Sequence, residues 1–129
     1  MDKELHLKLT VRLYTDDNQR CFGPGIATLL ERVRAHKSLR SAAASMGMAY
    51  SKAWTIVRRC EAELGFPLLH STTGGKHGGG AALTSQAQDL LQTYERYCRR
   101  VKEAAQALFQ EEFGADFCAP EEETHGAFH

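Results

Sequence analysis

The sequence lacks the features of a membrane or secreted protein. No apolar run approaches the ~20 residues that a transmembrane helix needs. The first residues, Met1-Asp2-Lys3-Glu4, alternate in charge and include no apolar segment of the kind found in a secretory signal. We therefore expect a cytoplasmic protein with no membrane partner.

The cysteines do not form any C-x-x-C pair, so the sequence does not support a zinc ribbon or a thioredoxin-like redox motif. In a cytosolic protein, Cys21, Cys60, Cys98 and Cys118 are expected to be buried or surface thiols. Cys118, His125 and His129 are ligand types at a spacing that a metal ion could use. Their Pro- and Glu-containing surroundings favour a solvated tail instead, and the sequence leaves open whether this tail binds metal.

Catalytic motifs are also missing from the sequence. No serine or cysteine lies in a G-x-S-x-G elbow. The glycine-rich run at 74–80 could cradle a phosphate, but Lys76 is followed by His77 and more glycines, so the run departs from a nucleotide-binding P-loop. We expect neither enzymatic activity nor a cofactor, and we assign no metal site.

The net charge of zero conceals a separation of charge along the chain. Residues 1–80 carry 12 Lys and Arg against 7 Asp and Glu, whereas residues 81–129 carry 4 against 9. Residues 32–80 alone have eight basic and two acidic side chains. This asymmetry favours a basic working surface beside an acidic tail, and an anionic partner.

The first half of the sequence predicts a hairpin followed by three helices. Leucine and valine alternate with polar residues over 5–13, which is typical of a half-buried strand, and 20–22 can return as a second strand. A helix follows with Pro24 in its first turn. Ser38 is a suitable N-cap for a second helix, which Gly47 ends. A third helix spans 50–64, and Trp54 lies on the stripe predicted to face its core.

The second half predicts another hairpin and a long helix. Residues 68–72 and 81–83 are short strands around the glycine-rich tip. Thr84 or Ser85 then caps a helix over 85–112, and Ser85 with Gln88 fits a capping box. Apolar residues recur along that helix at spacings of three and four, as in a dimerisation helix. The predicted dimerisation residues are Leu90, Leu91, Tyr94, Tyr97, Val101 and Leu108.

Two short helices joined at a glycine, then a third helix and a hairpin, define a winged helix-turn-helix. The predicted fold class is mainly α with small β-hairpins. Residues 1–84 form the DNA-binding domain with its N-terminal hairpin, 85–112 the dimerisation helix and 113–129 an acidic tail.

The outward face of the third helix carries the groups that meet base edges and phosphates. Ser51, Lys52 and Thr55 lie at its N-terminal end, which is the end that usually reads bases. We call the second hairpin, with its glycine-rich tip, the wing. The remaining candidates are better placed for phosphates or lie on this wing: Arg40, Arg58, Arg59, Thr72, Thr73, Lys76 and His77.

These segments resemble the N-terminal domain of the molybdate-responsive ModE regulators, which are related to the LysR type. The resemblance rests on F-G-P-G at 22–25, S-A-A-A-S-M-G-M at 41–48, Y-S-K-A-W at 50–54 and T-T-G-G-K-H-G-G-G-A at 72–81, and it runs from about residue 5 to about 110. It implies a transcription factor that binds a pseudo-palindromic operator as a homodimer. Ala49 and His77 depart from the usual pattern.

Molybdate binding is not expected, because residues 111–129 could not build the oxyanion-binding domains that follow in ModE regulators. Another interpretation of the same fold is a dimeric adaptor that binds a protein instead of DNA. Salt-dependent binding to a duplex separates the two.

Overall fold

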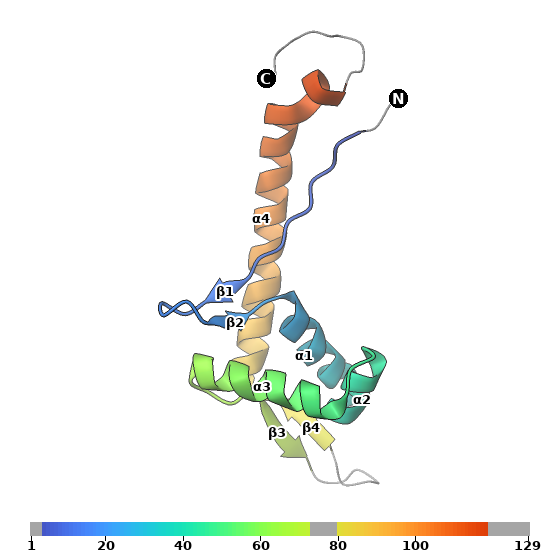
Figure 1. Ribbon diagram of the computed structural model, residues 1–129, viewed down its shortest axis with the longest axis vertical. Coiled ribbons are helices and arrows are strands. Elements are labelled where there is room, and N and C mark those ends of the chain that lie inside the picture. The colour runs from blue at the N-terminus through green and yellow to red at the C-terminus, as the bar shows by residue number, and fades with distance from the viewer. Residues whose placement is uncertain (1–3, 73–79, 119–129) are drawn as a thin grey trace. The chain divides into compact units, whose positions relative to one another are not determined.

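The computed structural model describes residues 4–72 and 80–118. It divides into two compact units, Thr10–Glu95 on the one hand and Met1–Leu9 with Arg96–His129 on the other. The elements follow in the order β1 (Leu13–Tyr14), β2 (Arg20–Phe22), α1 (Pro24–His36), α2 (Leu39–Ser45), α3 (Tyr50–Leu64), β3 (Leu69–Thr72), β4 (Gly80–Leu83) and α4 (Ser85–Cys118) (Figure 1). The predicted class, a mainly α winged helix-turn-helix with small hairpins, is confirmed.

The ends of the first three helices are set by local chemistry. Pro24 opens α1, and the Ser38 hydroxyl caps α2 by accepting a hydrogen bond from the Ser41 amide at 3.0 Å. Gly47 and Gly65 have φ values of +67° and +86°, a conformation that glycine adopts without steric cost. These glycines follow the ends of α2 and α3, which confirms the prediction made for Gly47.

The core of the Thr10–Glu95 unit is assembled from all of its main elements. Its largest fully buried side chains come from β2, α1, the residue just before β3, and α4. The ring of Phe22 packs edge-on against that of Tyr94, with ring centroids 5.0 Å apart. Ala42 and Ala43 are also fully buried, and their small side chains suit the close packing of α2 on its neighbours.

The second hairpin, β3 and β4, is antiparallel and pairs Leu69 with Leu83 and Thr72 with Gly80. The amide of Ala81 donates to the Lys37 carbonyl at 3.1 Å, which ties the hairpin to the end of α1. A Cβ at position 80 would meet the Thr72 hydroxyl at 2.1 Å, so glycine suits this pairing. The predicted contact residues Thr73, Lys76 and His77 lie outside the described residues.

The long N-terminal strand predicted from the alternation over 5–13 is wrong. Only Leu13 and Tyr14 are in a strand, and their pairing with β2 is irregular. Leu5 and Leu9 are 50% and 47% exposed. A strand needs a partner of similar length to satisfy its backbone, and β2 has only three residues.

Helix α4 begins at Ser85, as the sequence predicts, but extends further. Of the two candidate caps, Thr84 provides the cap, since its hydroxyl oxygen accepts from the Ala87 amide at 3.1 Å. The helix continues past the predicted end at residue 112 to Cys118, with non-helical backbone angles at Gly114. Glycine therefore interrupts the helix there without ending it. Within the described residues, no helix is long and apolar enough to span a membrane.

Candidate nucleic-acid interface

Helix α3 is amphipathic, with one face buried and the opposite face exposed. Ala53, Val57 and Cys60 are buried at positions that recur every three or four residues. The outward positions predicted from the sequence are all exposed: Ser51, Lys52, Thr55, Arg58, Arg59 and Ala62. The helix therefore presents two hydroxyls and three cations to solvent.

The N-terminal end of α3 carries its smallest polar groups. The Thr55 hydroxyl donates to the Ser51 carbonyl at 3.0 Å, a bond within the helix. This bond uses the only proton of the hydroxyl, so towards a partner Thr55 offers an acceptor oxygen and a methyl group. Such a side chain can meet an amino group of a base or the methyl group of thymine.

Two arginines at the edge of this surface stack on aromatic rings. The guanidinium of Arg40 lies 4.1 Å from the centre of the Tyr50 ring, and that of Arg58 lies 4.1 Å from the centre of the Trp54 ring. The prediction that Trp54 belongs to the core is wrong, because this side chain is 39% exposed. The buried face of α3 therefore includes fewer residues than the apolar pattern of the sequence predicts. One face of the Trp54 ring packs against the Arg58 guanidinium instead of the core.

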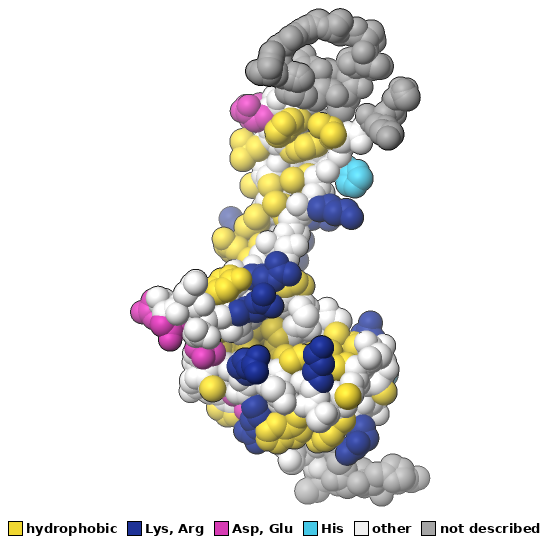
Figure 2. Space-filling model, viewed as in Figure 1, with side chains coloured by type: hydrophobic (Ala, Val, Ile, Leu, Met, Phe, Trp, Pro, Cys, Tyr) yellow, Lys and Arg dark blue, Asp and Glu magenta, His cyan; other side chains and the backbone are white. Residues whose placement is uncertain are grey.

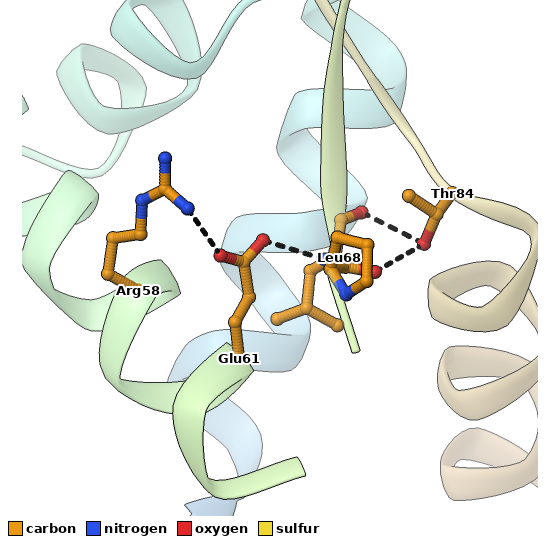
Figure 3. Close-up of polar contacts among 5 residues, drawn as sticks. Arg58, Glu61, Leu68 and Thr84 are labelled. Carbon is orange, nitrogen blue, oxygen red and sulfur yellow. Dashed lines mark hydrogen bonds and ion pairs between the residues drawn. The ribbon is translucent and has the colours of Figure 1, made fainter. Parts of the chain in front are cut away.

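Glu61 connects α3 to the wing. It accepts a hydrogen bond from Arg58 at 3.1 Å through one carboxylate oxygen and from the Leu68 amide at 2.7 Å through the other (Figure 3). Thr84 in turn donates through its hydroxyl to the Pro67 carbonyl at 2.7 Å. These contacts fix the start of β3 against α3 on one side and against the start of α4 on the other.

A hollow of about 260 Å³ lies between α3 and the hairpin β3–β4. Arg40, Tyr50, Trp54 and Arg58 line it on the helical side, and Ser71, Gly80 and Ala81 on the strand side. A second hollow, of about 530 Å³, flanks α3 elsewhere and includes Arg59 with Arg12 and Arg20. Arg12 and Arg20 were not singled out from the sequence, because they lie in or just before the N-terminal hairpin rather than in the helix-turn-helix.

The space-filling view of the Thr10–Glu95 unit shows more Lys and Arg than Asp and Glu on the visible face (Figure 2). Not every arginine is available to a partner. Arg32 donates to the Ser45 carbonyl and hydroxyl at 3.1 and 2.9 Å, which joins α1 to the end of α2. Its position in the basic segment therefore reflects a structural contact.

The predicted dimerisation residues separate into two groups. Leu91 is fully buried, and Tyr94 is buried with its hydroxyl donating to the Val11 carbonyl at 2.7 Å. Both belong to the core of the Thr10–Glu95 unit. Tyr97 and Leu108 are 54% and 58% exposed, and Leu90 and Val101 are partly exposed.

The buried thiols have a structural role. Burial raises the pKa of Cys60 to about 12, and its thiol donates to the Cys21 carbonyl. Burial also raises the pKa of Cys21, with the nearby Glu63 carboxylate adding to the effect. Among the described residues, no three His, Cys, Asp or Glu side chains are grouped to hold a metal ion. The side chains of Cys118, His125 and His129 lie outside the described residues.

The three-helix arrangement, the exposed basic face of α3 and the adjoining hairpin define a protein of the winged helix-turn-helix class. More particularly, residues 27–88 match the family of bacterial regulatory helix-turn-helix proteins of the LysR type. This match covers most of α1, all of α2, α3 and the second hairpin, and the start of α4.

Similarity to curated proteins extends further along the chain. The chain is 34% identical over 108 residues to the transcriptional regulator ModE of Haemophilus influenzae. The aligned residues cover 84% of this chain and 39% of that protein. The chain is 33% identical over 91 residues to the DNA-binding transcriptional dual regulator ModE of Escherichia coli, covering 70% of this chain and 32% of that one. The molybdenum-pterin-binding protein MopB of Rhodobacter capsulatus is 35% identical over 66 residues, 51% of this chain and 24% of MopB.

The chain thus resembles the ModE regulators in sequence, and it spans between about a third and two-fifths of the length of the two ModE regulators. The resemblance inferred from the sequence motifs is confirmed. The absence of molybdate binding stays a prediction.

Proposed function

We propose that this protein is a sequence-specific, DNA-binding transcriptional regulator that acts in the cytoplasm as a homodimer. The observation that carries the proposal is the exposed, basic outer face of α3 in a LysR-type helix-turn-helix domain. The similarity to proteins named as transcriptional regulators supports it.

In this proposal α3 enters the major groove with its N-terminal end towards the bases. Ser51, Lys52 and Thr55 contact base edges, and their position in the first two turns of the helix supports this role. Arg59 contacts phosphates, as do the wing residues Lys76 and His77. Thr72 pairs with Gly80 across the second hairpin and remains a proposed contact residue.

Homodimerisation uses the exposed part of the apolar stripe on α4. Leu90, Tyr97, Val101 and Leu108 follow one another at spacings of seven, four and seven residues along one helix. Pairing with the same face of a second copy would remove this apolar surface from water. A two-fold dimer would also place two α3 helices one turn of DNA apart, or a multiple of it, near 34 Å per turn.

Duplex binding measured against salt concentration tests the function. If the dimer contacts six or more phosphates, its affinity falls by about a thousandfold between 50 and 200 mM salt. Lys52→Ala should weaken binding, whereas Arg99→Ala, on the side of α4 opposite the apolar stripe, should not. A chain that binds no duplex at any of these salt concentrations would contradict the proposal and favour a protein-binding adaptor.

Sedimentation tests the dimer independently of DNA. The unmodified chain should sediment as a dimer at micromolar concentration, and Val101→Glu with Leu108→Glu should convert it to a folded monomer. Leu91→Glu is unsuitable for this test because Leu91 belongs to the core. A monomeric unmodified chain with full affinity for its operator would contradict the arrangement.

A further inference from the structure

The hollow between α3 and β3–β4 has an unusual wall, in which each of two aromatic rings lies beneath a guanidinium. Tyr50 and Trp54 are four residues apart and therefore lie on the same face of α3. Arg40 covers the first ring and Arg58 the second, each at 4.1 Å. We call these four residues the stacked row.

We propose that the stacked row is a seat for the sugar–phosphate backbone of one DNA strand, in which the rings hold the two guanidiniums ready for phosphate. The proposal rests on the proposed function and adds Tyr50 and Trp54 to the residues that support DNA contact. It assigns to the rings a positioning role and to Arg40 and Arg58 the phosphate contacts.

The charges around the hollow favour an anion. Of the described residues that line it, only Glu61 is acidic, and its two carboxylate oxygens are bound by Arg58 and by the Leu68 amide. A guanidinium has five N–H donors, so the bond to Glu61 leaves Arg58 the capacity to bind phosphate as well. The Arg58 side chain is 61% exposed, as such a contact requires.

The rings reduce the cost of holding these arginines in place. An exposed arginine normally loses much side-chain freedom when it binds, and stacking on an aromatic face restricts the guanidinium beforehand. The cation–π attraction, which is strongest for tryptophan, maintains this arrangement. The row therefore presents two planar phosphate-binding groups in defined positions.

The place of the row on α3 matches the path of a DNA strand. Tyr50 precedes Ser51, and Trp54 precedes Thr55, so the row adjoins the face that carries the proposed base contacts. A strand whose bases meet that face has its backbone at the edge of the groove, next to the row. The hairpin closes the other side of the hollow with small residues, Ser71, Gly80 and Ala81, which leave room for the backbone.

The first test is the salt dependence of binding to a generic duplex several helical turns long, since phosphate contacts do not depend on sequence. Arg40→Ala and Arg58→Ala should each reduce the slope of log affinity against log salt by about 0.9 for every phosphate that a protomer no longer neutralises. Trp54→Leu removes no charge, yet the salt dependence of duplex binding by this variant should weaken towards that of Arg58→Ala. The double variant Trp54→Leu/Arg58→Ala should be no weaker than Arg58→Ala alone.

Controls separate a positioning role from a loss of folding. Trp54→Phe keeps an aromatic ring and should recover most of the slope, and Arg99→Ala removes a charge outside the site and should leave it unchanged. Slopes of Arg40→Ala and Arg58→Ala equal to that of the unmodified protein would overturn the proposal while leaving DNA binding intact. An unmodified protein that binds no duplex would overturn the proposed function as well.

A second test needs no substitution. Trp54 is the only tryptophan in the sequence, so fluorescence excited at a wavelength that tyrosine does not absorb reports on the row alone. Saturating duplex should protect Trp54 from quenching by acrylamide, a neutral quencher that DNA does not repel. Unchanged quenching, while a labelled duplex shows full binding, would overturn the proposal.

Discussion

Glu61→Ala should destabilise the protein through the contact between α3 and the wing. The Leu68 amide donates to the Glu61 carboxylate at 2.7 Å, and Leu68 itself is fully buried. A hydrogen bond to a charged group contributes about 1.5–3 kcal/mol. The ion pair with Arg58 adds no more than about 0.5 kcal/mol, because the arginine is largely exposed. We therefore expect a loss of about 2–3 kcal/mol in the free energy of unfolding.

Urea unfolding at one protein concentration, followed by circular dichroism, measures this loss. Glu63→Ala is the matched control, because it removes the same charge from the same helix and breaks only a long hydrogen bond of 3.5 Å from Thr15. It should change the stability by less than about 0.5 kcal/mol. Glu61→Gln keeps an acceptor for the Leu68 amide and should lie between the two. Equal stability of Glu61→Ala and Glu63→Ala would refute the reasoning.

Three further predictions concern the packing and capping of the Thr10–Glu95 unit. Ser38→Ala removes the cap of α2 and should cost about 1 kcal/mol in urea unfolding; an unchanged midpoint would contradict the role of the cap. Leu91→Ala should lower the free energy of unfolding by about 2–5 kcal/mol, since Leu91 is fully buried. A change near zero would contradict its burial in the core. The pKa of the Cys60 thiol is about 12 in the folded protein and about 9 in the unfolded chain, so between these pH values only the unfolded chain is largely ionised at Cys60. Stability should therefore fall above pH 9 in the unmodified protein by up to about 1.4 kcal/mol per pH unit more than in Cys60→Ala, and parallel pH profiles of the two would contradict this.

The sequence predicts the helix-turn-helix well because its boundaries depend on local chemistry. Pro24, Ser38 and Gly47 each act through their own backbone or through a neighbour three residues away. The exposed face of α3 is equally local, since it follows from a period of 3.6 residues. The fold and most of the proposed base contacts could thus be inferred without coordinates.

The errors occur where a residue depends on partners distant in sequence. Periodicity places Trp54 on an apolar stripe of α3. It does not show that Trp54 is left 39% exposed, or that Arg58 packs on the ring. It likewise groups Leu91 with Leu108, although the first is buried under the winged unit and the second is exposed. The alternating N-terminal stretch predicts a strand but cannot supply the partner that a strand requires.

Selection of duplexes from a random pool, followed by sequencing, tests the central claim most directly. The unmodified chain should enrich a two-fold symmetric sequence whose half-sites are about one turn of DNA, or a multiple of it, apart. Thr55→Ala should lose sequence preference at one position in each half-site and keep it elsewhere, because Thr55 lies in the N-terminal half of α3, which we propose faces the bases. Enrichment of no sequence, or of the same sequence with undiminished preference by Lys52→Ala and Thr55→Ala, would contradict recognition through α3.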